Sequence, residues 1–294
     1  MIKWLNVKFA GIVSQKIFNN FMQNNIYYIF VLVFGLIIGS FLNCVIYRLE
    51  RNEKLSGRSY CPNCKHTLNW LDLIPVFSFL FLAGKCRYCR AKISIQYPLI
   101  ELLTGILYVL IFWSLGFHWA IGIKMRDLIN LLFSFYIISA LIVIFVYDLK
   151  HYLIPDKVLF PAIIITFLYR FLDNLLNWDI IGNYIFAALI AFVFFLAIYL
   201  ISKGRWMGFG DVKLAILLGL ILGFPDILVG LFLAFFFGAI IGVGAIFLSL
   251  PAGSQAKIGF KSEIPFGPFL ITGTLITMFW GQQIIDFYLS FFAF

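Results

Sequence analysis

Long apolar runs dominate this sequence and restrict what the chain can fold into. Four of them, residues 27–47, 128–147, 180–202 and 227–250, come close to the roughly 20 residues that a helix needs to cross a bilayer. Lipid offers backbone groups no hydrogen-bond partners, so these segments must be helices. A closed barrel would need segments of about 10 residues with alternating polarity, a pattern absent here. The chain, with 63% hydrophobic residues, is therefore predicted to be an all-α polytopic membrane protein.

The apolar pattern predicts about eight transmembrane helices. We place them at residues 27–47, 98–117, 128–147, 157–176, 180–202, 212–224, 227–249 and 266–290. The sixth has a lysine, Lys213, near its start and is soon followed by a proline, Pro225, which predicts a short or partly re-entrant segment. Residues 1–26 precede the first span as an extension without the small-residue cleavage site of a signal peptide. An interfacial helix and a disordered extension both remain open for it.

Lysine and arginine are distributed unevenly between the predicted loops, and this sets the orientation. Such residues accumulate on the cytoplasmic side of membrane proteins. Segment 48–97 holds nine of them, and loops 148–157, 203–213 and 250–265 hold seven, against three on the opposite side. We therefore predict that segment 48–97 is cytoplasmic, although three lysines within residues 1–26 leave the orientation of that extension open. Topology and anionic lipid account for the formal charge of +9 without a nucleic-acid partner.

Two pairs of cysteines in segment 48–97 have the spacing of a metal site. They are Cys61 and Cys64, then Cys86 and Cys89, each a C-x-x-C motif. This resembles the spacing of zinc ribbons, in which two residues between thiolates let both sulfurs bind one ion at about 2.3 Å. Two disulfides are the alternative, which a reducing cytoplasm disfavours. Four cysteines complete a tetrahedron and leave no open position, so the zinc ion is predicted to be structural. The apolar stretch 68–82 between the pairs is interpreted as an interfacial segment that docks the ribbon on the membrane.

Two aspartates are predicted to lie at the same membrane face. Asp148 ends the third span, and Asp211 lies at the start of the sixth, after Gly208 and Gly210. Carboxylates near hydrocarbon are costly and usually pair or serve function. Two of them together can share one proton, so that one draws a proton from water while the other polarises a carbonyl. This is aspartic-protease chemistry.

Simpler interpretations stand beside this one. Asp211 could cap its helix, because aspartate at a helix start accepts backbone N–H bonds, and for Asp156 capping is the better interpretation. Gly238 and Gly242, four residues apart in the seventh span, are interpreted as a close helix-packing face.

Taken together, these motifs resemble the type IV prepilin peptidases, also called prepilin leader peptidase and N-methyltransferase. The resemblance extends from about residue 35 onward. The first-span signature lies at residues 39–48, and the two cysteine pairs follow it with segment 72–75 between them. The remaining motifs occur in the order expected for the family, at residues 96–101, 148–156, 208–214 and 265–269.

The resemblance implies an aspartic endopeptidase of the G-x-G-D type in the bacterial plasma membrane. It would remove the short basic leader from prepilins and pilin-like proteins at the cytoplasmic face, with Asp148 and Asp211 as catalytic residues. Members with the cysteine loop also methylate the new N terminus with S-adenosylmethionine. The motifs themselves assign no residue to that step. The resulting domain organisation is the extension 1–26, the first helix 27–47, a zinc-binding loop domain 48–97 and a peptidase domain 98–294.

Three other functions are weighed against this one. A proton-coupled transporter would place its carboxylates near mid-membrane and would usually show internal repeats, and neither is seen. A membrane-anchored zinc-ribbon binding module leaves both aspartates unexplained. A presenilin-type protease would cleave within the membrane, whereas the cysteine motif and the cytoplasmic-edge aspartates favour prepilin as the substrate.

Overall fold

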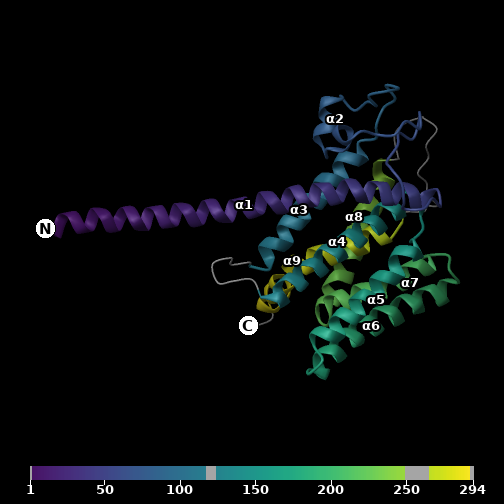
Figure 1. Ribbon diagram of the computed structural model, residues 1–294. Coiled ribbons are helices and arrows are strands. Elements are labelled where there is room, and N and C mark those ends of the chain that lie inside the picture. The colour runs from purple at the N-terminus through teal and green to yellow at the C-terminus, as the bar shows by residue number, and fades with distance from the viewer. Residues whose placement is uncertain (1, 117–123, 249–264, 292–294) are drawn as a thin grey trace. The chain divides into compact units, whose positions relative to one another are not determined.

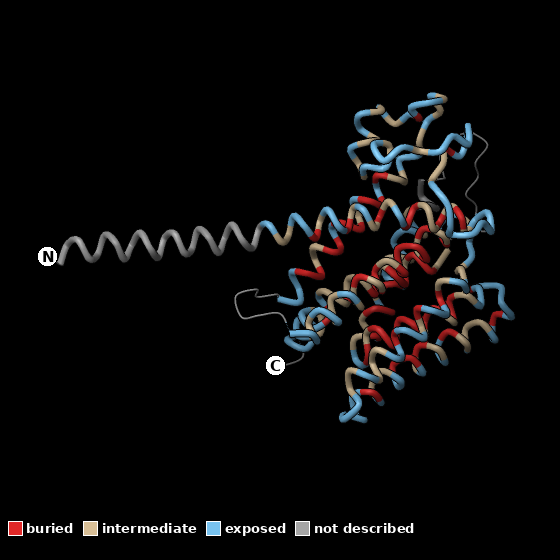
Figure 2. Tube along the Cα trace, viewed as in Figure 1, coloured by how far each residue is buried: buried red, intermediate tan, exposed pale blue. Residues whose placement is uncertain are grey.

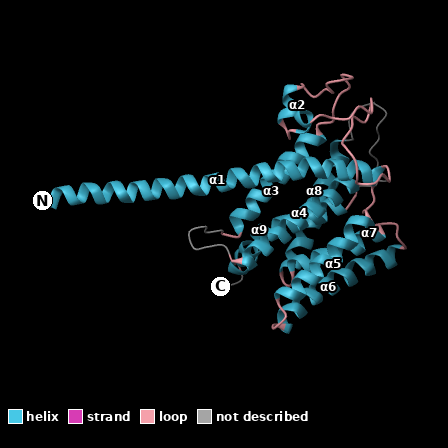
Figure 3. Cartoon of the chain, viewed as in Figure 1, coloured by secondary structure: helices cyan, strands magenta, loops and turns pink. Residues whose placement is uncertain are grey.

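The computed structural model describes residues 2–116, 124–248 and 265–291 of the chain. Contacts divide the chain into two compact units, which are described separately below. Unit 1 comprises residues 1–45 and 54–139, and unit 2 comprises residues 46–53 and 140–294. The described residues form helices and loops without a strand element, apart from two isolated bridges in the cysteine loop (Figure 3). The predicted all-α fold is confirmed for this part of the chain.

Helices of unit 1 pack closely through small residues. The unit contains most of α1 (Ile2–Glu50), the short η1 (Trp70–Leu73) and α2 (Phe77–Phe81), α3 (Gln96–Ser114) and the first part of α4 (Met125–His151) (Figure 1). A Cβ atom on Gly35 would lie 2.7 Å from the Cα atom of Gly105, so α1 and α3 touch backbone to backbone. Tyr108 of α3 stacks on Phe135 of α4 with ring centroids 3.9 Å apart, and this contact joins α3 to α4.

Unit 2 is built around α7. Its helices are the end of α4, α5 (Asp156–Asp173), α6 (Trp178–Ser202), α7 (Phe209–Leu222), α8 (Asp226–Leu248) and α9 (Gly267–Ser290). Although α7 has only 14 residues, it packs against α5, α6, α8 and α9, and its buried positions appear red in Figure 2. The Arg170 side chain of α5 donates to the carbonyls of Leu220 and Ile221, at 3.3 and 2.6 Å. A cation at the carboxyl end of α7 also suits the helix dipole.

Five helices within the described residues are long and apolar enough to cross a membrane. They are Ile26–Glu50, Gln96–Ser114, Met125–His151, Trp178–Ser202 and Asp226–Gly244. All five coincide with predicted spans, and the chain is accordingly a multi-pass membrane protein. The helices α5, α7 and α9 coincide with the other three predicted positions, while the extension 1–26 continues into α1 without a break.

The close helix contacts of unit 2 are not where the sequence pattern placed them. A Cβ atom on Gly242 would meet nothing within 4 Å, and one on Gly238 would make only ordinary contacts, so the predicted packing face is wrong. Instead, Gly273 of α9 lies against the backbone of Gly230 in α8, and Gly219 of α7 lies against the backbone of Ala188 in α6. The sequence alone gives each apolar helix several glycines, and only the neighbouring helix decides which of them is buried.

Candidate active site and cysteine cluster

The two aspartates singled out by the sequence meet in unit 2. Asp148 lies in the last turn of α4, and Asp211 lies in the first turn of α7. They are 4% and 8% exposed, respectively, and their carboxylates are close enough to interact electrostatically. Among the described residues, neither carboxylate forms an ion pair with a cationic side chain. Two buried acids without a countercharge are easiest to accommodate when they share one proton.

Glycines lie next to both carboxylates, and the main chain of a glycine contacts each acid. The backbone amide of Gly208 donates to the Asp211 carboxylate, and the amide of Gly267 donates to the Asp148 carboxylate. There is no room for a Cβ atom on Gly267, which would overlap the Asp148 carboxylate. The Oδ2 atom of Asp148 is nevertheless buried without a hydrogen-bond partner of its own.

Capping and catalysis do not exclude each other at Asp211. Gly208 is the N-cap of α7, with extended backbone at φ −74° and ψ 151° and no side chain to cap the helix. Asp211 sits three residues later and accepts the Gly208 N–H, which is half of a capping box. The Asp211 carboxylate is thus held in one orientation by its own helix.

Asp156 is not the N-cap of α5, but it lies in the first turn of that helix, where its charge suits the helix dipole. Pro155 is the N-cap of α5 and makes no side-chain cap bond. The Asp156 carboxylate instead binds the Nζ atom of Lys213 on α7. Because Asp156 opens α5 and Lys213 follows Asp211 by two residues, this ion pair connects the start of α5 to the helix that carries one of the two acids.

All four predicted cysteine ligands come together in unit 1. Their Sγ atoms lie within 4.8 Å of one another, and those of Cys61 and Cys89 are 3.9 Å apart. Four sulfurs at 2.3 Å from one ion would be separated by about 3.8 Å. None of the cysteines forms a disulfide. The group therefore has the composition and spacing of a site that can hold a tetrahedral metal ion.

Each cysteine pair is built on the same turn. In the first pair, the N–H of Lys65 donates to the carbonyl of Cys61, and the N–H of Cys61 donates to the carbonyl of His66, both at 2.9 Å. In the second pair, the N–H of Arg90 donates to the carbonyl of Cys86 at 3.0 Å, and the N–H of Cys86 donates to the carbonyl of Ala91 at 2.8 Å. Lys65 and Arg90, each directly after the second cysteine of its pair, share a φ of 60°. The His66 ring lies on the Tyr88 ring, with centroids 3.7 Å apart, and is not part of the sulfur group.

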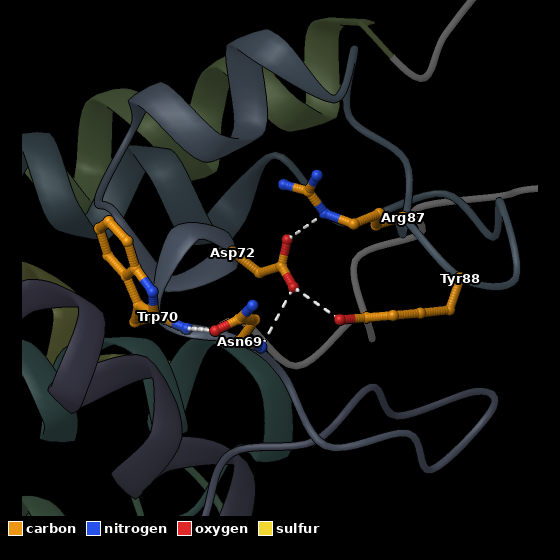
Figure 4. Close-up of polar contacts among 5 residues, drawn as sticks. All are labelled: Asn69, Trp70, Asp72, Arg87 and Tyr88. Carbon is orange, nitrogen blue, oxygen red and sulfur yellow. Dashed lines mark hydrogen bonds and ion pairs between the residues drawn. The ribbon is translucent and has the colours of Figure 1, made fainter.

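A polar network connects η1 to the second cysteine pair (Figure 4). The Asp72 carboxylate, whose side chain is 3% exposed, accepts from Arg87 Nε at 2.6 Å, from Asn69 N–H at 3.1 Å and from Tyr88 Oη at 3.4 Å. Burial alone would raise the pKa of Asp72. The Arg87 and Asn69 hydrogen bonds outweigh burial, and they hold this pKa below its usual value.

Two polar residues that the sequence analysis did not single out as site residues are buried in unit 1. Glu101 on α3 is 7% exposed and Asn43 on α1 is 3% exposed. Both lie in apolar helices, where a charged or amide side chain is itself a signal of function. That signal was available in the sequence, but it does not say which polar groups would face each other.

The fold and the acidic pair define a class, namely multi-pass helical membrane proteins with two juxtaposed carboxylates and a four-cysteine loop. Comparison with known proteins is more specific. Residues 33–115 match the Bacterial Peptidase A24 N-terminal domain, and residues 135–243 match the Type IV leader peptidase family.

Curated relatives agree over nearly the full length. Prepilin leader peptidase/N-methyltransferases from Aeromonas salmonicida (strain A449) and Bacillus subtilis (strain 168) are each 32% identical, covering 90% and 88% of this chain and 94% and 96% of their own. The Pseudomonas aeruginosa protein of the same name is 31% identical, over 90% of this chain and 93% of its own. No solved structure matches the chain. The chain belongs to the prepilin leader peptidase/N-methyltransferase family.

Proposed function

We propose that Asp148 and Asp211 form the catalytic pair of a membrane aspartic endopeptidase that removes the leader peptide from prepilins. Membership in the family makes the chain a bifunctional prepilin peptidase and N-methyltransferase. The observation that supports the assignment of residues is the burial of two interacting carboxylates without a countercharge in one unit. The rest of the site fits this role, because glycine backbone lies directly against both acids.

The chemistry of such a pair follows from a single shared proton. The ionised carboxylate takes a proton from water as the water oxygen attacks the scissile carbonyl carbon. The protonated carboxyl group donates its proton to the carbonyl oxygen, and the tetrahedral intermediate then collapses with protonation of the leaving amine. The Gly208 and Gly267 amides keep the two carboxylates oriented throughout, since they donate to Asp211 and Asp148.

The finer topology is also part of the proposal. All eight predicted segments lie in the plasma membrane, and α7, which has only 14 residues, is a short or partly re-entrant segment among them. Both the cysteine loop 48–97 and the aspartates face the cytoplasm, and the peptidase domain extends over residues 98–294. The support for this orientation is the distribution of basic residues, of which those in segment 250–264 lie outside the described residues. A prepilin helix in the membrane would present its basic leader at this face.

A zinc ion would be held by the sulfurs of Cys61, Cys64, Cys86 and Cys89 in a structural role. The mutual spacing of these atoms fits a tetrahedral ion, and thiolates are the ligands that zinc prefers in such sites. We expect about one zinc per chain by elemental analysis of the purified protein, and loss of that zinc in Cys61→Ala. Full zinc content in this variant would contradict the assignment.

S-adenosylmethionine would supply the methyl group for the second reaction, and the substrates would be prepilins and pilin-like proteins. This proposal is supported by the relatives, which are named prepilin leader peptidase/N-methyltransferases and which this chain covers over nearly their full length. The methyl donor and the prepilin must both reach the enzyme at the same membrane face.

The test of the peptidase assignment is cleavage of a prepilin with a basic leader by wild type, Asp148→Ala and Asp211→Ala in lipid nanodiscs. Each variant is expected to lose at least about 100-fold in cleavage rate while remaining folded. Asp173→Ala, at the last residue of α5, is the matched control and should cleave normally. Cleavage at the wild-type rate by both site variants would move the function to transport or binding.

A further inference from the structure

A second polar cluster lies in unit 1, and the peptidase mechanism does not use it. Its centre is Glu101, which is buried in α3 and accepts a hydrogen bond from Val76 N–H at 2.7 Å and another from the Ser40 hydroxyl. Within the described residues, Glu101 forms no ion pair with a cationic side chain. Burying a carboxylate in an apolar helix without a countercharge costs free energy, and such residues usually mark a functional site.

Asn43 adds an unused acceptor to the same helix interface. Its Nδ2 atom donates to the carbonyls of Gly39 and Tyr97, at 3.3 and 3.0 Å. Both amide protons are thereby used, which fixes the orientation of the amide group. Its Oδ1 atom is buried and has no hydrogen-bond partner. Only a ligand that donates hydrogen bonds would satisfy this oxygen.

The two acceptors belong to facing turns of two helices. Gly39 and Asn43 are one turn apart on α1, as are Tyr97 and Glu101 on α3. A Cβ atom on Gly39 would lie 2.7 Å from the Cα atom of Glu101, while Asn43 binds the carbonyl of Tyr97. The helices therefore touch at this level, and the acceptors cannot move apart without breaking that contact.

The loop beside this interface is strained. Val76 has a φ of 63° and a ψ of −51°, and Phe77 N–H donates to Pro75 O at 2.6 Å, which makes Val76 the apex of a γ-turn. This backbone conformation is rare, above all for a β-branched residue. Such strain persists where surrounding groups enforce it, and the Glu101 carboxylate holds the Val76 amide in place.

We propose that Glu101 and Asn43 bind the newly exposed N-terminal amine of the cleaved prepilin for methylation, with Glu101 as the proton acceptor. This inference rests on the proposed function, whose second product is an N-methylated terminus. A carboxylate and an amide oxygen together fit an aliphatic ammonium group, which carries a positive charge and several N–H donors. Hard metal cations would need about six or more oxygen ligands.

The reaction balances with these groups. The substrate ammonium transfers one proton to the Glu101 carboxylate, and the freed nitrogen lone pair attacks the methyl carbon of the sulfonium donor. The carbon–sulfur bond breaks, its electron pair stays on sulfur, and a carbon–nitrogen bond forms. Asn43 Oδ1 accepts an N–H bond and aims the lone pair at the methyl group. The protonated Glu101 afterwards releases its proton to water.

The test separates methylation from cleavage by using the full chain in nanodiscs with a pre-cleaved pilin peptide and labelled S-adenosylmethionine. Glu101→Gln keeps an acceptor for Val76 N–H but removes the charge. It should lower methyl transfer at least about 100-fold, the usual range for a lost proton acceptor. Asn43→Ala should lower it about 10-fold, as expected for one hydrogen bond to a charged group. Cleavage of intact prepilin by both variants should stay within about twofold of wild type, a range that is small against the typical effect of a catalytic group.

Two controls guard against a merely structural effect. Thr104→Val changes a fully buried residue of the same helix, whose hydroxyl donates to the carbonyl of Ile100 at 2.7 Å, and this variant should methylate normally. Residual methylation by Glu101→Gln should also rise about tenfold per pH unit below the amine pKa of about 8, because solvent must now supply the free amine. A flat pH profile would contradict the proton-acceptor role.

The remaining outcomes overturn the proposal in distinct ways. Methylation at the wild-type rate by Glu101→Gln excludes Glu101 as the acceptor. Joint loss of cleavage and methylation assigns the residue to folding. The methyl donor also carries an α-ammonium group, so loss of S-adenosylmethionine binding by Glu101→Gln would assign the cluster to the donor instead. Failure of wild type to cleave prepilin would count against the proposed function alone, since the methylation assay starts from a pre-cleaved peptide.

Discussion

At the scale of single residues, the absence of a side chain matters as much as the presence of the acids. Asp148 is bordered by Gly267, whose backbone amide donates to the carboxylate and whose missing Cβ atom leaves space for it. Ile154 fills the adjoining space and lies 3.2 Å from where a Cβ atom on Gly210 would be. Any methyl group added on this side must displace either the acid or the helix that carries it.

Gly267→Ala is therefore expected to lower cleavage about 100-fold, because a displacement of about 1 Å at a reacting group costs that much. The effect should appear in the rate of cleavage by the folded protein in nanodiscs. Gly242→Ala is the matched control, since a Cβ atom there meets nothing within 4 Å. Equal activity of the two variants would show that the Asp148 carboxylate does not need its present position.

Asp72 gives a second residue-scale prediction, which concerns pH. Its pKa is depressed in the folded state, so the network stabilises the loop above the ordinary aspartate pKa of about 3.9 and loses that contribution as pH falls through the folded value. Asp72→Asn should speed amide hydrogen exchange in segment 69–73 at neutral pH. After correction for intrinsic exchange rates, the difference should shrink as pH falls below about 3.9 and vanish once pH lies below the depressed folded pKa.

Tyr88→Phe provides the comparison for this pH effect. It removes only a neutral hydroxyl at 3.4 Å from the Asp72 carboxylate. Tyr88→Phe should speed amide exchange less than Asp72→Asn does. Its effect should be almost the same at neutral pH and at acid pH, as long as the pH stays above the pKa of Asp72. An Asp72→Asn effect of equal size at both ends of the range would rule out a charged Asp72 as the stabilising group.

At the scale of helices, the sequence predicts where the helices lie better than it predicts which of their residues are in contact. The long apolar runs predict the helices because, in lipid, the backbone groups of each run must form their hydrogen bonds within that run. The cysteine spacing predicts the cluster because two residues between thiolates let both sulfurs reach one ion. The pairing of Asp156 with Lys213 was not predicted, since it depends on how α5 meets α7. For the same reason, the sequence pattern favours Gly238 and Gly242 as a packing face, whereas the close contacts are made by Gly230 and Gly219.

The contact between α6 and α7 yields a prediction about stability. Gly219 lies so close to the backbone of Ala188 that a Cβ atom cannot fit. Gly219→Ala should destabilise the protein by about 1–3 kcal/mol, the usual cost of overpacking, despite the better helix propensity of alanine. Gly182→Ala on α6 has open space around it and should be neutral or slightly stabilising in the same thermal unfolding experiment.

At the scale of the whole molecule, the two units do not correspond to two uninterrupted halves of the chain. Unit 2 takes in residues 46–53, where Glu50 lies 3.8 Å from His151 and Asn52 accepts from Lys157 at 3.2 Å. A fragment of residues 124–294 is therefore expected to lack prepilin cleavage on its own. Co-expression with residues 1–116 should restore it, as measured in membranes. Full cleavage by the fragment alone would show that residues 46–53 are dispensable.

The shared use of α1 also has a consequence for the order in which the protein can be made. Residues 46–53 leave the ribosome first, yet their partners in unit 2 begin at residue 140, after the whole of segment 54–139 has been synthesised. During membrane insertion the end of α1 must wait, with its polar groups unpaired or bound elsewhere, until α4 and α5 arrive. Proteolytic activity can thus arise only late in synthesis, when nearly the entire chain is in the membrane.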